Sequence, residues 1–167
     1  MSTLEAVQGD ITRETTDAIV NAANTSLAAG GGVCGAIHRA AGPDLARACR
    51  ALGGCPTGSA MITPGFNLGA RYVIHAVGPV WQGGTANEAE QLASCYRAAM
   101  AVAADYHLRS LAFPCISTGI YGYPIGEAAE IAVRTVTAQL THLPAIELVR
   151  FVCFSEADLE VYRKLVS

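Results

Sequence analysis

Short runs of β-branched and aliphatic residues alternate with stretches of helical periodicity along all 167 residues of the chain. The apolar runs predict six strands, at residues 4–7, 18–22, 60–63, 72–77, 111–116 and 148–154. Between them, apolar residues recur three and four positions apart, which indicates amphipathic helices. This alternation is typical of a layered α/β domain with helices on both faces of a sheet. Because no repeat or linker interrupts it, we expect a single domain over residues 1–167.

Capping residues mark where the predicted helices begin. A short helix is expected from Pro43, since proline suits the first turn. Asn87 and Glu90 have the spacing of a capping box at the start of a longer helix. Pro124 precedes a third helix, and Ser155 is expected to cap the last one.

The charge pattern argues against a protein that coats nucleic acid. The chain has 11 basic and 14 acidic residues, a net charge of −3 and a single lysine, Lys164. Binding to nucleic acid needs a basic footprint that displaces counterions from phosphates. Arg134, Arg150 and Arg163 are expected to be solvated surface charges.

No segment predicts membrane insertion or secretion. The longest uncharged stretches, residues 18–38 and 51–70, contain several glycines, whereas a spanning helix needs about 20 mostly apolar residues. The first residues lack the basic and apolar segments of a secretory signal. Six cysteines without a CxxC pair suit a reducing compartment. We therefore expect a cytoplasmic protein with no membrane partner.

The first of two glycine-rich stretches follows a predicted strand. Gly30, Gly32 and Gly35 have the spacing of the dinucleotide-binding fingerprint. That fingerprint also requires an acidic residue about 20 positions further on. Residues 51–70 contain no Asp or Glu, which argues against an NAD-dependent dehydrogenase.

The second glycine-rich stretch, at residues 116–124, lies between a predicted strand and a predicted helix. Successive backbone N–H groups in such a loop form a concavity that favours anions. Neither stretch is followed by Gly-Lys-Ser/Thr, which excludes a P-loop nucleotidase. Two anion-binding loops without a lysine indicate a ligand with a diphosphate that is bound but not transferred. Tight turns that require glycine are the alternative for either stretch alone.

Five motifs together resemble a macrodomain of the MacroD type. They are VQGDIT at residues 7–12, IVNAAN at 19–24, GGGVCGAIHRAAG at 30–42, CPTG at 55–58 and ISTGIYGYP at 116–124. The resemblance implies a three-layer α/β/α sandwich around a mixed sheet of about six strands. Members of this family bind ADP-ribose, and many hydrolyse O-acetyl-ADP-ribose or remove ADP-ribose from acidic side chains.

The resemblance also assigns the adenine and diphosphate contacts. Asp10 resembles the carboxylate that binds the adenine amino group beside the N–H of Ile11, and Phe154 the aromatic near adenine. The alternatives are a turn-capping aspartate and a core aromatic. The two glycine-rich stretches would supply the remaining contacts, with Tyr121 also covering the distal ribose: Gly31, Gly32, Val33, Ser117, Thr118, Gly119, Ile120 and Tyr121.

Two residues decide whether hydrolysis is expected. Asn24 matches the amide that orients the distal ribose, and its carbonyl and NH₂ suit a hydroxyl that both donates and accepts. Asn21 is expected to tie down backbone between loops. Cys34 stands where hydrolytic members carry an aspartate, which is proposed to orient or activate water. A thiol is a weak acceptor, so we expect slow hydrolysis through Asn24, Cys34 and Tyr121, with a non-hydrolytic ADP-ribose reader as the alternative.

The simplest interpretation of Cys34 is a small residue tolerated in the lining of the pocket. His38 lies four residues later, which leaves a Cys–His nucleophile pair as a further alternative. Zinc requires three or four ligands and no others lie nearby in the sequence, so no metal site is expected. We also expect no cofactor. The expected partners are ADP-ribose and ADP-ribosylated proteins or metabolites, bound by a monomer.

Overall fold

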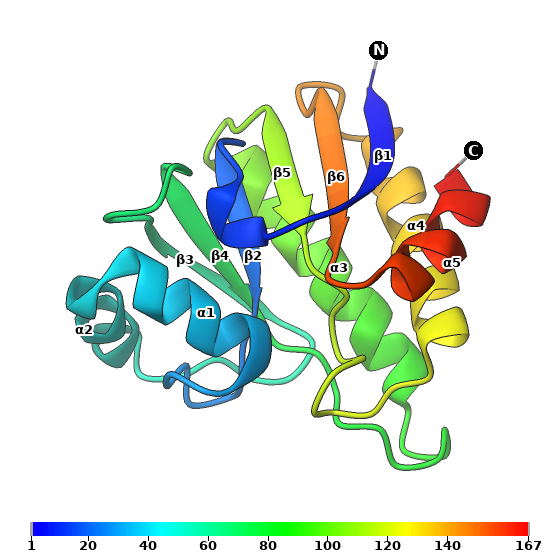
Figure 1. The fold of residues 1–167 in the computed structure, drawn as a ribbon, viewed down its shortest axis with the longest axis horizontal. Helices are drawn as coiled ribbons and strands as arrows, with labels where there is room; N and C mark the ends of the chain where they lie inside the picture. Colours follow the sequence, from blue (N-terminus) through cyan, green and yellow to red (C-terminus); the bar gives the residue numbers. More distant parts are fainter. Residues whose placement is uncertain (1, 167) are drawn as a thin grey trace.

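Six strands form one mixed sheet in the computed structural model, which describes residues 2–166 (Figure 1). The strands are β1 (Thr3–Gln8), β2 (Ala18–Ala22), β3 (Ala60–Pro64), β4 (Tyr72–Ala76), β5 (Ser110–Phe113) and β6 (Leu148–Cys153). All six overlap the predicted runs, although β5 ends at Phe113 and not at Ile116 as expected. The helices are α1 (Gly32–Ala41), α2 (Pro43–Leu52), α3 (Glu88–Asp105), α4 (Ile125–Leu140), α5 (Glu156–Val166) and the short 3₁₀ helix η1 (Ile11–Arg13).

The strand order is β1-β6-β5-β2-β4-β3, and only the β3–β4 pair is antiparallel within the described residues. Helices α1 and α2 pack a smaller core against one face of the sheet. Helices α3, α4 and α5 pack a larger core against the other face. The expected α/β/α sandwich is therefore confirmed. The carboxyl ends of the parallel strands lie together at one end of the sheet, below β5 and β6 in Figure 1.

The predicted start of three helices is confirmed. Helix α2 begins at Pro43, α4 follows Pro124, and the Ser155 hydroxyl accepts a hydrogen bond from the Asp158 N–H at 3.1 Å. The capping box at Asn87 is wrong. Asn87 precedes α3 in the left-handed conformation, and its side chain makes no capping hydrogen bond.

The residue that secures the start of α3 is Glu88. Its side chain is buried, and it accepts hydrogen bonds from the N–H groups of Gln82, Gly84 and Ala86 at 2.7–2.9 Å. Burial opposes ionisation, but these three N–H groups, together with the N–H of Glu88 itself, hold the pKa of Glu88 at about 2. One carboxylate thus fixes the loop between β4 and α3.

We expect Glu88→Gln to lower the free energy of unfolding at neutral pH and to flatten its acid dependence. The folded-state pKa of about 2 lies below the ordinary 4.5, so the carboxylate stabilises the fold above pH 4.5 and loses this effect as the pH falls toward 2. Urea unfolding across that pH range measures the difference. Glu90→Gln, on the exposed side of the same turn, is the control. Equal pH slopes in the two variants would contradict this assignment.

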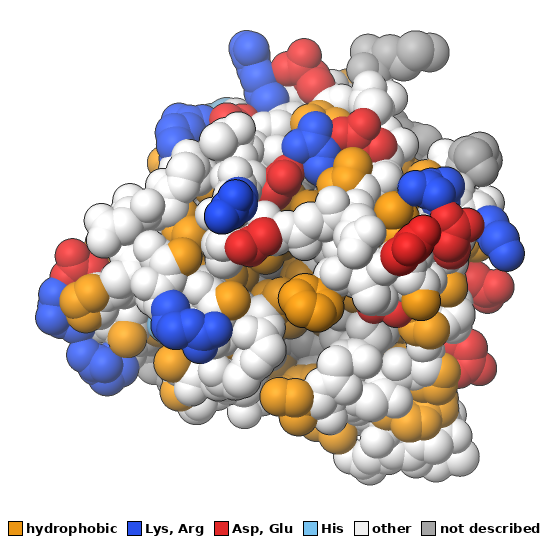
Figure 2. All heavy atoms as spheres, in the orientation of Figure 1, with side chains coloured by type: hydrophobic (Ala, Val, Ile, Leu, Met, Phe, Trp, Pro, Cys, Tyr) orange, Lys and Arg blue, Asp and Glu red, His pale blue; other side chains and the backbone are white. Residues whose placement is uncertain are grey.

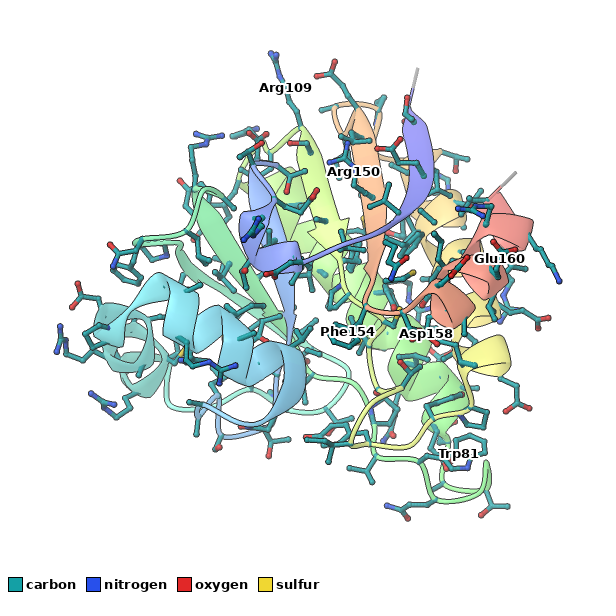
Figure 3. The ribbon with its side chains drawn as sticks, in the orientation of Figure 1. Trp81, Arg109, Arg150, Phe154, Asp158 and Glu160 are labelled. Carbon is teal, nitrogen blue, oxygen red and sulfur yellow. The ribbon has the colours of Figure 1, made fainter. Side chains whose placement is uncertain are left out.

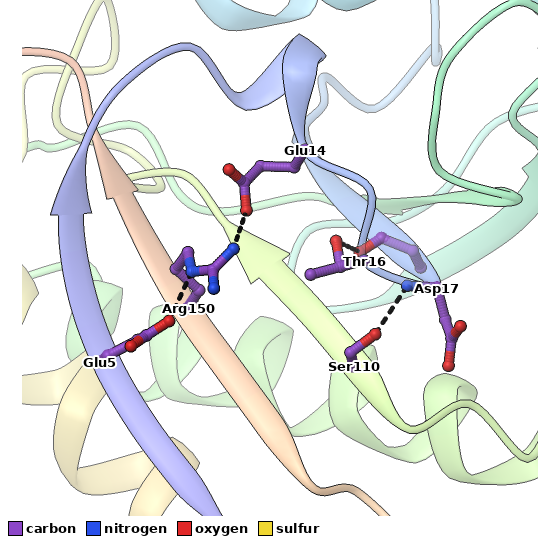
Figure 4. Close-up of polar contacts among 7 residues, drawn as sticks. Glu5, Glu14, Thr16, Asp17, Ser110 and Arg150 are labelled. Carbon is purple, nitrogen blue, oxygen red and sulfur yellow. Dashed lines mark hydrogen bonds and ion pairs between the residues drawn. The ribbon is translucent and has the colours of Figure 1, made fainter.

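Arg150 is not the solvated surface charge that the sequence predicts. Its half-buried guanidinium donates from Nε to Glu5 at 2.6 Å and from Nη1 to Glu14 at 2.7 Å (Figure 4). These bonds, to Glu14 and to Glu5, raise the pKa of Arg150. The arginine therefore links β6 to β1 and to the segment after η1.

The six cysteines are free thiols in the described structure, and all except Cys115 are buried. Among the helices of residues 2–166, none combines the length and apolar character that crossing a bilayer requires.

Candidate functional site

A cavity of about 1120 Å³ opens where β2, β5 and β6 end. In Figure 2, hydrophobic side chains surround a hollow between the side of the molecule that carries α1 and the side that carries α5. Ligands of open α/β sheets bind in such crevices at the carboxyl ends of strands. The cavity brings together every residue expected at the site: Asp10, Ile11, Asn24, Gly31, Gly32, Val33, Cys34, Ser117, Thr118, Gly119, Ile120, Tyr121 and Phe154.

Three charged side chains line the described cavity, and sequence reasoning found only Asp10. Arg39 and Asp158 are the other two. The guanidinium of Arg39 folds back along α1, and its Nη1 lies 3.1 Å from the position a Cβ on Gly35 would take. The sequence signal that could have placed Arg39 at the cavity is its position four residues after Gly35. Residues four apart lie on the same helix face, but this applies only if a helix is known to begin at Gly32.

The first glycine-rich stretch turns directly into α1. Gly31 caps the helix without a side chain, and the first N–H bonded within this turn is that of Gly35, to the Gly31 carbonyl at 3.2 Å. A Cβ on Gly35 would lie 2.5 Å from the Gly30 carbonyl oxygen, so the tight entry requires glycine. The preceding N–H groups and the positive end of the helix dipole therefore face the cavity.

The second stretch forms a loop after β5. Ser117 adopts the left-handed conformation, with φ of 68°. The N–H groups of Gly119, Ile120 and Tyr121 donate to no other group within residues 2–166. Ile120 is 81% exposed, and its Cδ1 lies 3.0 Å from the Cβ position of Gly31 in the first stretch. The two loops therefore meet, and both present unpaired N–H donors.

Neighbouring backbone holds this second loop in place. The N–H of Trp81 donates to the Tyr121 carbonyl at 2.8 Å. Gly78 packs so closely that a Cβ there would lie 2.3 Å from Ser117 Oγ and 2.6 Å from Ile116 Cγ2. The loop after β4 thus supports the loop after β5.

Asp10 and Phe154 lie at the end of the cavity near β1 and β6. Asp10 Oδ1 accepts hydrogen bonds from Thr12 Oγ1 at 2.6 Å and from the Thr12 N–H at 3.0 Å, which lower the pKa of Asp10. The aspartate is therefore a cap of η1, and its Oδ2 has no partner among residues 2–166. Phe154 is 88% exposed at the lower end of β6 (Figure 3), so the core-aromatic alternative is wrong.

Asn24 holds its own loop together. Its Oδ1 accepts from Ser26 Oγ at 2.7 Å and from the Ala28 N–H at 3.1 Å, while Nδ2 donates to the Ala28 carbonyl at 2.9 Å. Both lone pairs of Oδ1 are occupied, and one Nδ2 hydrogen remains. Contrary to the expectation from its amide, Asn24 is thus set up to donate to a ligand hydroxyl and not to accept from it.

Cys34 is 6% exposed in the first turn of α1. Its Sγ donates to the Ala28 carbonyl at 3.6 Å and accepts from Asn21 Nδ2 at 3.7 Å. Asn21 also donates to His75 Nδ1 at 3.1 Å, so it binds two side chains instead of tying down loop backbone as expected. The Cys34 thiol therefore has a hydrogen-bond partner on each side, the Ala28 carbonyl and the Asn21 amide.

Behind Asn21, His75 continues this chain of hydrogen bonds. Burial, together with the nearby His38, lowers the pKa of His75 to about 4, so the ring is neutral at neutral pH. Because Nδ1 accepts from Asn21, the proton resides on Nε2 and is donated to Thr63 Oγ1 at 3.0 Å. The buried row Thr63–His75–Asn21–Cys34 runs from the sheet to the cavity wall.

His38 does not complete a nucleophilic pair. The ring is buried, which lowers its pKa, and neither ring nitrogen has a hydrogen-bond partner within the part of the chain that the structure describes. Across residues 2–166, no three His, Cys, Asp or Glu side chains gather as metal ligands would.

Comparison with known proteins gives consistent matches. The model of the Macro domain family matches residues 20–132. A Macro domain-containing protein of Chlorobaculum tepidum is 60% identical over 98% of this chain and 95% of its own length. The O-acetyl-ADP-ribose deacetylase of Salmonella typhimurium is 54% identical over 99% of this chain and 95% of its own.

Solved structures agree with the fold. The Oceanobacillus iheyensis macrodomain with ADP has a TM-score of 0.92 at 48% identity, over 96% of this chain and 88% of that one. The Trypanosoma brucei macrodomain in complex with ADP-ribose has a TM-score of 0.93 at 43% identity, over 98% of this chain and 69% of that one.

Proposed function

The chain belongs to the Macro domain family, and from this premise we propose that it binds ADP-ribose in the cavity and hydrolyses ADP-ribosyl esters. The observation that carries the proposal is the pair of facing N–H rows, from the start of α1 and from Gly119 to Tyr121, in a cavity without a lysine. Such rows suit a diphosphate that is held and not transferred. The substrates proposed are those of the MacroD type, O-acetyl-ADP-ribose and ADP-ribose on acidic side chains.

In this proposal the ligand lies along the cavity with adenine at the η1 end. Asp10 Oδ2 accepts from the adenine amino group beside the N–H of Ile11, and Phe154 packs on the ring. The diphosphate lies between the two loops, where the guanidinium of Arg39 adds a positive charge to the wall. The distal ribose reaches Asn24, whose free Nδ2 hydrogen donates to a hydroxyl, while Tyr121 covers it.

Hydrolysis requires a water molecule to attack the ester and a group to take its proton. Cys34 is engaged on both sides, by Ala28 and by Asn21, so it does not serve as that group. The loss of a general base costs about 10²–10⁴-fold in rate. Turnover then rests on positioning by Asn24 and on the substrate's own phosphate or hydroxyl oxygens. The missing carboxylate at position 34 is also the observation that favours a non-hydrolytic reader, the second candidate function.

Titration calorimetry with ADP-ribose and AMP tests the binding. We expect ADP-ribose to bind much more tightly than AMP, because only ADP-ribose spans both N–H rows. Asp10→Ala should weaken binding by about 1–3 kcal/mol, the loss of a charge-assisted hydrogen bond. Asp105→Ala, an equal charge change at the end of α3, is the control. Equal affinities for ADP-ribose and AMP would refute the proposal.

We propose further that the chain acts as one monomeric domain and that its ligands are free ADP-ribose and ADP-ribosylated proteins or metabolites. The net charge of −3 and the single lysine support the proposal that bare nucleic acid is not a partner.

A further inference from the structure

Two cysteines meet where β5 and β6 end, one of them, Cys115, in the wall of the cavity and the other, Cys153, buried behind it. The Sγ atoms of Cys115 and Cys153 are 3.8 Å apart. The β5–β6 register pairs Phe113 with Phe151, and Cys115 and Cys153 each follow two residues further along the chain.

The other four cysteines have different contacts. Cys34 donates to the Ala28 carbonyl, Cys49 contacts the ring of His75, and the thiols of Cys55 and Cys95 each donate to a nearby backbone carbonyl. Among the described residues, Cys115 and Cys153 are therefore the pair of cysteines whose sulfurs contact each other and could form a disulfide.

The two thiols differ in access and in acidity. Cys115 is partly exposed and lines the cavity, whereas Cys153 is fully buried. The thiol of Cys115 donates to Cys153 Sγ, and this contact lowers the pKa of Cys153 and raises the pKa of Cys115. When the pair loses one proton, the negative charge therefore resides on Cys153, and the remaining proton lies on Cys115, the sulfur that a small molecule in the cavity can reach.

We propose that Cys115 and Cys153 form a reversible disulfide when the protein meets hydrogen peroxide, and that this bond closes the ADP-ribose site. The accessible Cys115 Sγ attacks one peroxide oxygen while its proton passes to the Cys153 thiolate, which forms a sulfenic acid on Cys115 and releases hydroxide. Cys153 then attacks Cys115 Sγ, forms the S–S bond and expels a second hydroxide. The two thiol protons convert both hydroxides to water, so the two sulfurs lose two electrons and the peroxide gains them.

Closure follows because the same two residues anchor both ends of the binding site. The Cys115 carbonyl accepts from Thr118 Oγ1 at 2.9 Å, at the start of the diphosphate loop. The Cys153 carbonyl accepts from the Gly9 N–H at 3.0 Å, beside Asp10, and Phe154 follows directly. An S–S bond of about 2.05 Å draws the sulfurs together from 3.8 Å and displaces these anchors.

The effect is reciprocal, because linkage couples the two equilibria. If the disulfide weakens ADP-ribose binding by a given factor, bound ADP-ribose opposes disulfide formation by the same factor. The regulatory part of this inference rests on the proposed function, whereas the disulfide itself does not.

The full chain is treated with hydrogen peroxide, digested, and mapped by mass spectrometry, with ADP-ribose titrations before oxidation, after it, and after dithiothreitol. We expect a peptide linked through Cys115 and Cys153 and a dissociation constant raised about tenfold or more, reversed by dithiothreitol. Cys115→Ala and Cys153→Ala should each abolish the linked peptide and the response. Cys55→Ala, which leaves the pair intact, should keep both.

Three results would overturn the inference. They are a pair that stays reduced, a different disulfide, and the expected disulfide with unchanged affinity. If the reduced protein does not bind ADP-ribose at all, the proposed function and the regulation both fail. The peptide map still decides whether the disulfide forms.

Discussion

Asn24→Ala is expected to lower the rate of O-acetyl-ADP-ribose hydrolysis by about 100-fold, since a displacement of about 1 Å at a reacting centre has an effect of that size. The substitution removes three hydrogen bonds that fix residues 25–28 and the one N–H left to orient the distal ribose. Steady-state kinetics on the native chain and the variant measure the effect. Ser26→Ala, which removes the two hydrogen bonds of the Ser26 hydroxyl but keeps both Asn24–Ala28 bonds and the Asn24 amide, should change the rate far less. An Asn24→Ala rate equal to that of Ser26→Ala would contradict the assignment.

Variants of Cys34 in the same assay separate hydrolase from reader. If positioning and substrate assistance drive the reaction, Cys34→Ala should reduce the rate by less than about tenfold. A Cys34→Ala variant without activity would assign the thiol a direct catalytic role. An inactive native chain in which Cys34→Asp gains about 100-fold or more would identify a reader on a hydrolytic scaffold.

Gly78→Ala is expected to weaken ADP-ribose binding by about fivefold to 150-fold, the equivalent of about 1–3 kcal/mol of overpacking. The new Cβ would lie 2.3 Å from Ser117 Oγ and must displace the diphosphate loop. Calorimetry measures the affinity, and thermal unfolding reports any loss of stability. Gly126→Ala in α4, where a Cβ meets no other atom within 4 Å, is the matched control. Unchanged affinity in Gly78→Ala would mean that this loop does not hold the diphosphate.

Local signals predicted the elements well. Strand positions follow from short apolar runs, and Pro43, Pro124 and Ser155 act on the turn next to them, so the starts of α2, α4 and α5 were readable. The capping box predicted at Asn87 was wrong because the N–H groups of the preceding loop bind the Glu88 carboxylate, a contact that the local capping pattern does not encode.

Contacts between distant segments could not be read from the sequence. Arg150 bonds Glu5 across 145 positions. Asn21 faces His75 because the β2–β4 register pairs them, and no local pattern encodes that register. The site residues were predicted through the motifs. Arg39 and Asp158 were missed because their place in the cavity depends on how α1 and α5 pack.

The row from Thr63 through His75 to Asn21 ends in an N–H donor that faces position 34. That donor exists whether position 34 holds a thiol or a carboxylate, since the neutral His75 fixes the orientation of the Asn21 amide. In the proposed site the diphosphate is held elsewhere in the cavity, by the backbone N–H groups of the two loops, which an exchange at position 34 leaves in place. Under the proposed function, ligand affinity and reaction rate are therefore separable in this scaffold: a substitution at position 34 is expected to change the rate and to leave the affinity for ADP-ribose nearly unchanged.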